Sequence, residues 1–117
     1  MSHARTVLIT GGNRGIGYAI AEQFRDLGHR VAVTARSGAG PSGCLSVRAD
    51  VTDGASLDRA IAEVEQSLGP IEVLVANAGI TRDTLLMRMA DEDFEDVINT
   101  NLSGVFRVVK RAIKSMI

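Results

Sequence analysis

Residues 6–17 read TVLITGGNRGIG, a short apolar run that is followed directly by a glycine-rich turn. Continuous apolar runs of this length are typical of strands buried on both faces of a parallel sheet, so we expect a strand at Thr6–Thr10. Apolar residues then recur at helical spacing and end before Gly28, which is typical of a helix stop. This pattern predicts a helix with a packed face made of Ile16, Ala19, Ile20, Phe24 and Leu27. A strand, a glycine turn and a helix therefore open the chain, as at the start of an α/β fold.

The alternation of strand and helix continues along the rest of the chain. Apolar runs predict further strands, and apolar residues every three or four positions predict further helices. The expected elements are strands near 31–35, 45–49 and 71–76, a helix with Leu57, Ile61, Val64 and Leu68 on its packed face, and a long helix from about Asp91 to the chain end. Such alternation implies right-handed crossovers, so we expect an incomplete, doubly wound parallel sheet of the Rossmann type, with four strands and flanking helices.

Composition places the chain among ordinary globular proteins. Of its 117 residues, 45% are hydrophobic and 23% are charged, and the formal net charge is −1. This balance argues against a disordered chain and against a partner that is nucleic acid or an anionic membrane. A single cysteine and the lack of a signal-like or membrane-spanning run indicate a cytoplasmic location. The two histidines lie in a tail and a turn, and no metal site is expected.

The glycine turn has the properties of a phosphate-binding loop. Glycines let the backbone approach a phosphate, while the following helix directs its N-terminal N–H groups and positive dipole at the anion. The spacing is Gly-x-x-x-Gly-x-Gly, and no Gly-Lys-Ser/Thr follows, which excludes a phosphate-loop ATPase. The alternative is that the glycines serve only the strand-to-helix turn. We expect a dinucleotide diphosphate to be held by Gly11, Gly12, Asn13, Arg14, Gly15, Ile16 and Gly17.

Two arginines indicate which dinucleotide the loop would bind. Roughly 20 residues beyond such a loop, an acidic residue normally binds the ribose hydroxyls, whereas an arginine accommodates a 2′-phosphate. The chain has Arg36 and no acid in that place, and Arg14 adds a second guanidinium. Paired guanidinium groups suit a phosphate dianion, so we expect NADP(H) as the cofactor. The alternative is a pair of solvated surface arginines.

Polar residues also stand at the ends of the third and fourth predicted strands. Asp50 and Val51 follow the third strand, and Asn77, Ala78 and Gly79 follow the fourth. The two residues after Val51 suffice to cap the next helix, which leaves Asp50 free to bind an adenine amino group. Asn77 is expected to bind the ligand as well, the alternative being a turn residue. All of these positions lie at the edge where α/β sheets bind ligands.

Asn101 stands out on the last predicted helix. It falls on an apolar stripe, with Val97 and Ile98 one turn earlier and Val105 one turn later. A polar group on a buried stripe must be hydrogen-bonded, or it costs about 1–3 kcal/mol. Gly104 weakens the same helix by about 1 kcal/mol relative to Ala. Two interpretations are equally open: a structural amide satisfied by a neighbouring backbone, or a residue that organises an active site beside the nicotinamide.

Together these motifs resemble those of the short-chain dehydrogenase/reductase family over nearly the whole chain. Two further segments look closest to bacterial 3-oxoacyl-ACP reductases, namely residues 77–89 and 99–106. The motifs that match the family in succession are residues 10–17, Asp50-Val51, Asn77-Ala78-Gly79 and Asn101.

The resemblance implies NADPH-dependent reduction of 3-oxoacyl-ACP to 3-hydroxyacyl-ACP in fatty-acid synthesis. It implies an acyl carrier protein thioester as the substrate and a homo-oligomer as the complete protein. It also implies that Asn101 is catalytic, because the matching asparagine of the family holds a water in the proton relay. Arg14 and Arg36 match the basic positions of family members that use NADP.

One feature departs from the family pattern. The catalytic serine and the Tyr-x-x-x-Lys pair are absent, since the only tyrosine, Tyr18, is followed four positions later by Glu22. Residues 1–117 are thus expected to be the NADP(H)-binding half of a single Rossmann-type domain without its catalytic half, and inactive alone. The chain is then part of a longer protein or a natural truncation. The alternatives are a stand-alone NADP(H)-binding module and a related reductase of acetoacyl-CoA or a ketone.

Overall fold

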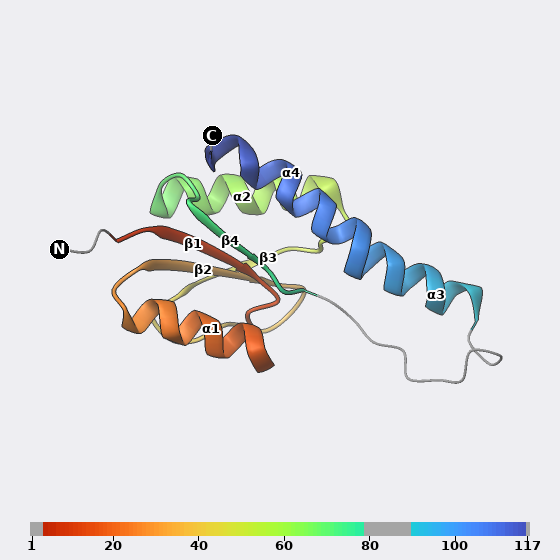
Figure 1. Ribbon diagram of the computed structural model, residues 1–117, viewed down its shortest axis with the longest axis horizontal. Helices are drawn as coiled ribbons and strands as arrows, with labels where there is room; N and C mark the ends of the chain where they lie inside the picture. The colour runs from red at the N-terminus through yellow and green to blue at the C-terminus, as the bar shows by residue number, and fades with distance from the viewer. Residues whose placement is uncertain (1–3, 79–89, 117) are drawn as a thin grey trace.

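A computed structural model describes residues 4–78 and 90–116 of the chain (Figure 1). Each strand and helix expected from the sequence has a counterpart within these ranges. The elements are β1 (Thr6–Thr10), α1 (Gly15–Asp26), β2 (Arg30–Ala35), β3 (Leu45–Arg48), α2 (Gly54–Leu68), β4 (Val73–Ala76), α3 (Asp91–Val97), a π-helical segment (Ile98–Ser103) and α4 (Gly104–Met116).

The strands form one parallel sheet in the order β3-β2-β1-β4. Leu8 at the centre of β1 pairs with Ala32 of β2 on one side and with Leu74 of β4 on the other. Every residue of β1 is buried, as the uniformly apolar run predicts. The carboxyl ends of all the strands therefore meet at one edge, and the predicted Rossmann-type sheet is confirmed.

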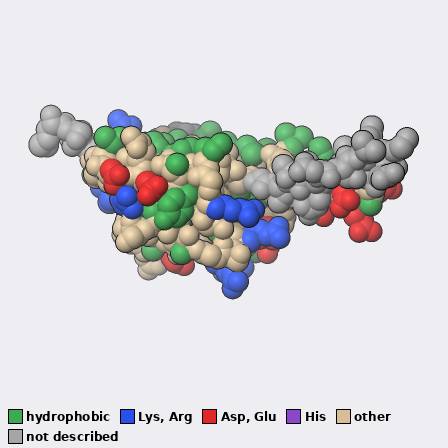
Figure 2. All heavy atoms as spheres, turned by 90° about the horizontal axis from the view of Figure 1, so that it is seen from below, with side chains coloured by type: hydrophobic (Ala, Val, Ile, Leu, Met, Phe, Trp, Pro, Cys, Tyr) green, Lys and Arg blue, Asp and Glu red, His purple; other side chains and the backbone are tan. Residues whose placement is uncertain are grey.

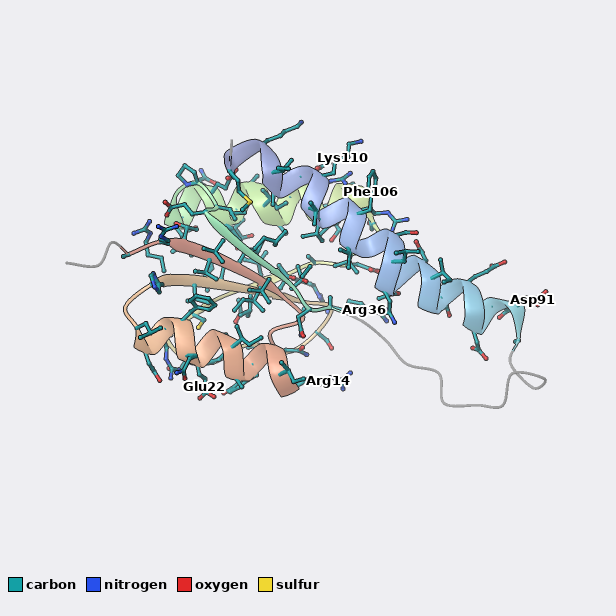
Figure 3. The ribbon with its side chains drawn as sticks, viewed as in Figure 1. Arg14, Glu22, Arg36, Asp91, Phe106 and Lys110 are labelled. Carbon is teal, nitrogen blue, oxygen red and sulfur yellow. The ribbon has the colours of Figure 1, made fainter. Side chains whose placement is uncertain are left out.

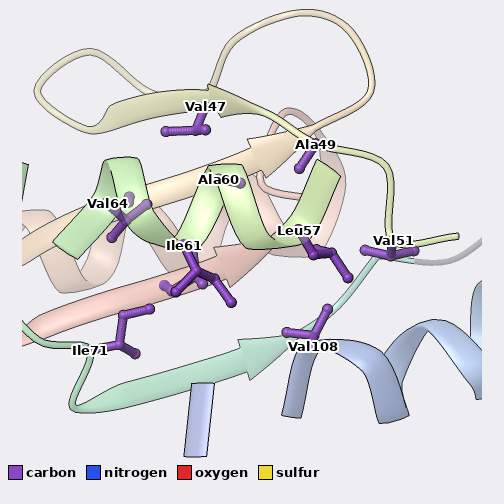
Figure 4. Packing of buried hydrophobic residues seen from close by; sticks show 11 residues of the cluster. Val47, Ala49, Val51, Leu57, Ala60, Ile61, Val64, Ile71 and Val108 are labelled. Carbon is purple, nitrogen blue, oxygen red and sulfur yellow. The ribbon is translucent and has the colours of Figure 1, made fainter. Parts of the chain in front are cut away.

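Helices cover both faces of this sheet (Figure 1). α1 packs against one face, whereas α2 and α4 pack against the other. Because side chains alternate along a strand, Val7 and Ile9 join the cluster beneath α1 and Leu8 joins the opposite one. Figure 4 shows the second cluster, which lies between the sheet and α2. Its buried members are Leu8, Ala32, Val47, Ala49, Val51, Leu57, Ala60, Ile61, Val64, Ile71 and Val108.

The packed face predicted for α1 is correct only in part. Ile20 and Phe24 pack against the cluster beneath the helix, but the fully buried residue beside them is Ala21, whereas the predicted Ala19 is exposed. Ile16 and Leu27 are instead 74% and 64% exposed. The reason is their place at the two ends, since Ile16 lies beyond the edge of the sheet beside a cavity and Leu27 is already the C-cap residue.

The fourth strand begins later than the predicted run 71–76. Ile71 precedes the strand, and its N–H donates to the carboxylate of Glu65 at 3.2 Å. The N–H of Glu72 donates to the carbonyl of Thr6 at 2.9 Å. Ile71 is nevertheless completely buried. Ile71, the first residue of the apolar run, is therefore buried beneath α2 but does not belong to the strand.

The last helical stretch differs from the single α-helix that the sequence predicts from about Asp91. A π-helical segment, Ile98–Ser103, separates α3 from α4. Because a π segment carries an extra residue per turn, it changes which side chains face the sheet. A Cβ on Gly104 would lie 2.8 Å from Cγ2 of Val51, so a glycine permits the close packing at this point. Among the residues of this stretch whose burial the structure describes, the buried ones lie four apart, at Thr100, Gly104, Val108 and Ala112.

Candidate functional site

A cavity of about 560 Å³ lies at the carboxyl edge of the sheet, beside the glycine loop. This is the edge at which open α/β sheets bind ligands. Most residues singled out from the sequence line it: Gly11, Asn13, Arg14, Gly15, Ile16, Arg36, Val51, Asn77 and Ala78. The others do not line it, namely Gly12, Gly17, Asp50 and Asn101, while Gly79 lies outside the described residues.

Close backbone contacts shape the glycine loop. Gly11 has a φ of +71°, and a Cβ on it would lie 2.8 Å from Cα of Ala78. A Cβ on Gly17 would collide with the carbonyl oxygen of Gly11 and with the side-chain amide of Asn77. The loop conformation therefore requires glycine at both positions, so part of the motif serves the strand-to-helix turn itself.

The N-terminus of α1 is open toward the cavity. Arg14 at the N-cap makes no capping hydrogen bond with its side chain, and the first turn contains no acidic residue. α2 differs, because Oδ1 of its N-cap Asp53 accepts from the N–H groups of Ala55 at 3.0 Å and Ser56 at 3.4 Å. The first N–H groups of a helix have no partner within it. Those of α1 are thus available to an anion in the cavity.

Replacing Asp53 by Ala is expected to destabilise the chain by about 1 kcal/mol, because the two capped N–H groups of α2 lose their acceptor. The measurement is the midpoint of urea unfolding at unchanged slope. Asp53→Asn is the matched control, since it keeps an acceptor oxygen and should retain most of the stability. Equal midpoints for Asp53→Ala and the original chain would contradict the assigned cap.

Two arginines border the cavity from different elements. Arg14 precedes α1 and Arg36 follows β2, and Figure 3 shows both at the same end of the sheet. Both are exposed, and neither guanidinium makes a hydrogen bond or ion pair within the part of the chain that the structure describes. Figure 2, which views the molecule from the side of α1, shows basic side chains gathered near the middle of this face. The site is therefore positively charged on two sides.

Asp50 has a local partner that the sequence did not predict. Its Oδ1 accepts from the backbone N–H of Thr52 at 2.9 Å and from the Thr52 hydroxyl at 2.7 Å. The hydroxyl hydrogen bond is the main reason that the pKa of Asp50 lies below its usual value, and Arg36 and Arg107 act in the same direction against partial burial. The expectation of an unengaged carboxylate is wrong, because Oδ1 closes the turn before α2.

Asn77 supports the glycine loop from the end of β4. Its side-chain Nδ2 donates to the carbonyl of Gly11 at 3.1 Å. The backbone N–H groups of Asn77 and Ala78 both donate to the hydroxyl of Thr10, at 3.0 and 3.2 Å. Thr10 is buried, and although it belongs to the loop motif, the supporting role of its hydroxyl was not predicted from the sequence. Its only signal is a hydroxyl at the end of an apolar strand.

Asn101 lies in the π-helical segment and is exposed, so the prediction that it falls on a buried stripe is wrong. The stripe assumed α-helical spacing, and the i→i+5 turn shifts the buried position to Thr100, which is 5% exposed and lines the cavity. π-helical turns occur often at functional sites. The structure thus places Asn101 next to a cavity-lining residue without showing its role.

Arg107 holds the π-helical segment against the turn between β3 and α2. Its Nη1 donates to the carbonyls of Val51 and Asn99, both at 3.2 Å. Its Nη2 donates to Oδ1 of Asn99 at 2.7 Å. Sequence reasoning missed this residue, because nothing local distinguishes it from the other basic residues of the last helix. It joins the π-helical segment that carries Asn101 to Val51, which follows β3 and lines the cavity.

Comparison with known proteins places this geometry in a family. The family model described as short chain dehydrogenase matches residues 5–117. The chain belongs to the short-chain dehydrogenase family. The resemblance predicted from the sequence motifs is confirmed.

The relatives within the short-chain dehydrogenase family include two named reductases. The chain is 56% identical over 97% of its length to the 3-oxoacyl-[acyl-carrier-protein] reductase MabA of Mycobacterium tuberculosis (strain H37Rv), covering 46% of that protein. It is 42% identical over 96% of its length to the 3-oxoacyl-[acyl-carrier-protein] reductase FabG of Escherichia coli (strain K12), covering 49% of it. The chain thus spans about half the length of the curated relatives it matches.

Among solved structures, the ligand-free aldohexose dehydrogenase of Thermoplasma acidophilum superposes with a TM-score of 0.91 at 33% identity. The match covers 97% of the chain and 44% of that structure.

Within the described residues, no helix is long and apolar enough to cross a membrane. The same residues contain no group of three or more His, Cys, Asp or Glu side chains arranged to hold a metal ion.

Proposed function

We propose that residues 1–117 form the NADP(H)-binding half of a cytoplasmic reductase that converts 3-oxoacyl-ACP to 3-hydroxyacyl-ACP in fatty-acid synthesis. The observation that carries this proposal is the cavity at the uncapped N-terminus of α1, bordered by the guanidinium groups of Arg14 and Arg36. The substrate is taken from relatives that are 56% and 42% identical and are named 3-oxoacyl-ACP reductases. An acyl carrier protein thioester is therefore the proposed partner.

The residues at the cavity fit the parts of NADP(H) one by one. The diphosphate fits the open N-terminus of α1, where Gly11 and Gly15 line the cavity and leave room for it. The 2′-phosphate fits between Arg14 and Arg36, because guanidinium groups bind phosphate oxygens with charge-assisted hydrogen bonds. Gly12 and Gly17 support the loop without lining the cavity.

The remaining cavity residues fit the nucleosides. Val51 presents an apolar surface for an adenine ring, and Asp50 beside it keeps Oδ2 without a hydrogen bond among the described residues. Asn77 and Ala78 line the other side, next to the glycine loop. We propose Gly79, which lies outside the described residues, as a further contact with the cofactor, because it continues the Asn77-Ala78 motif.

When bound, NADPH supplies a hydride, and the residues at the cavity bind and orient the cofactor. Reduction of a carbonyl also needs a proton donor to the developing alkoxide. The chain has no Tyr-x-x-x-Lys pair, since Tyr18 is its only tyrosine. The proposed role of Asn101 is to hold a water of the proton relay beside the cavity-lining Thr100.

The complete protein is proposed to be a homo-oligomer. α4 and the π-helical segment expose an apolar stripe along one side, and Lys110 lies over the ring of Phe106 at 5.9 Å from its centroid (Figure 3). Extended apolar patches on a soluble protein indicate a contact surface. The stripe consists of Ile98, Leu102, Phe106, Val109, Ile113 and Met116, which are 38–66% exposed.

Titration of the chain with NADPH and NADH tests the proposed cofactor. NADPH is expected to bind at least about tenfold more tightly, because one charge-assisted hydrogen bond contributes about 1.5–3 kcal/mol and 1.4 kcal/mol corresponds to tenfold. The measurement is the pair of dissociation constants from calorimetry, with the rise in melting temperature as a second readout. Competition by 2′-AMP but not by 5′-AMP is the matched control. Equal affinities for the two nucleotides would contradict the NADP assignment.

A further inference from the structure

Arg48 links the edge strand to the turn that carries Arg36. It is the last residue of β3 and pairs with Ala35 of β2. Its Nε donates to the carbonyl oxygen of Arg36 at 3.1 Å. That carbonyl belongs to Arg36, the residue that directly follows β2 and lines the cavity.

The next carbonyl of this turn is held from the opposite side. Nδ2 of Asn13, in the glycine loop, donates to the carbonyl oxygen of Ser37 at 3.0 Å. Two consecutive carbonyls after β2 are thus bound by side chains from two different elements. Ser37 lines the cavity with Arg36 and Asn13, so this turn forms part of its wall. Such bracing fixes the backbone before a ligand arrives, which lowers the ordering cost of binding.

Arg48 also adds positive charge at the same place. It is exposed, and within the described residues its side chain has no ion-pair partner and no hydrogen bond other than the one to the Arg36 carbonyl. A charged residue on an edge strand commonly prevents pairing with other chains. That explanation accounts for the charge of Arg48 but not for its hydrogen bond to the Arg36 carbonyl. The guanidinium lies within hydrogen-bond distance of the backbone that carries Arg36, and its other N–H groups remain available.

We propose that Arg48 is a positioning residue for NADP(H) specificity, which fixes the turn carrying Arg36 and strengthens the field at the 2′-phosphate. This inference rests on the proposed NADP(H) function and extends it to a residue outside the cavity wall. The phosphate is discriminated by the Arg36 guanidinium, and Arg48 acts through its backbone. A residue that served only to join β3 to β2 would affect both nucleotides equally.

The test compares Arg48→Gln with the original chain in titrations with NADPH, NADH and 2′-AMP. The NADPH and 2′-AMP dissociation constants are expected to rise about five- to tenfold, while that of NADH changes less than about twofold. The NADPH affinity of the variant should also depend less on salt, because one charge near the phosphate is gone. Arg48→Lys keeps the charge but replaces the planar fork, so it should lose less.

Arg5→Gln is the matched control, since Arg5 is exposed and precedes β1, at the end of the sheet opposite the cavity. It should leave all three constants unchanged. Equal losses for NADPH and NADH in Arg48→Gln, or no loss in either, would overturn the inference. Failure of the proposed function is distinguishable, because the original chain itself would then show no preference for NADPH. A melting curve of each variant confirms that the comparison is between folded chains.

Discussion

Replacing Arg36 by Asp is expected to reverse the nucleotide preference from NADPH to NADH. Arg36 lines the cavity at the end of β2, and its guanidinium makes no ion pair within the described residues. Its loss removes a charge-assisted hydrogen bond to the 2′-phosphate of about 1.5–3 kcal/mol. The new carboxylate repels that phosphate and accepts hydrogen bonds from the free ribose hydroxyls of NADH. The ratio of dissociation constants should therefore shift by about a hundredfold or more.

The measurement is calorimetric titration of the variant with both nucleotides at one ionic strength. Arg36→Lys is one control, because it keeps a positive charge and should retain part of the NADPH preference. Arg59→Asp is the second, since it makes the same change of charge on an exposed part of α2 that does not line the cavity. An unchanged ratio in Arg36→Asp would show that Arg36 does not contact the 2′-phosphate, which would leave Arg14 as the remaining candidate.

The order of elements could be predicted because its signals are local. The run Thr6–Thr10 is apolar throughout and ends in glycine, and the structure buries all of it in the centre of the sheet. The π-helical segment could not be predicted, because its contacts come from distant parts of the chain. Arg107 bonds the Val51 carbonyl across a separation of 56 residues, and Gly104 packs against the side chain of Val51. An α-helical period assumed through residues 98–103 therefore placed Asn101 on the wrong face.

The site, like the fold, could be predicted where its signals are local, but not where it depends on contacts between distant residues. Residues at the strand ends, such as Arg36 and Asn77, were found because parallel strands bring their carboxyl ends to one edge. Side chains that hold those residues in place were not found. Thr10 binds the N–H of Asn77 across 67 residues, and Arg48 binds the carbonyl of Arg36 across a strand pairing. A sequence shows which residues have the chemistry for a ligand but not which distant side chain fixes them.

The largest loss of cofactor binding is expected from Gly17→Val. A Cβ at Gly17 would collide with the Gly11 carbonyl oxygen and with Nδ2 of Asn77, which are hydrogen-bonded to each other at 3.1 Å. The glycine loop must then move away from α1, which separates the N-terminal N–H groups of the helix from the backbone of Gly11. Because hydrogen bonds weaken steeply with poor geometry, NADPH binding should weaken by about a hundredfold. Overpacking of this kind also costs about 1–3 kcal/mol of folding stability.

Two measurements separate these effects in Gly17→Val. The midpoint of urea unfolding gives the change in stability. The change in affinity comes from titration with NADPH without denaturant, once circular dichroism has shown that the chain is folded. Ala19→Val is the matched control, because it adds the same side chain to an exposed position of the same helix and should leave NADPH binding unchanged. A folded Gly17→Val chain that bound NADPH as tightly as the original would show that the contact between α1, Gly11 and Asn77 does not position the phosphate loop, and the glycine would then serve packing alone.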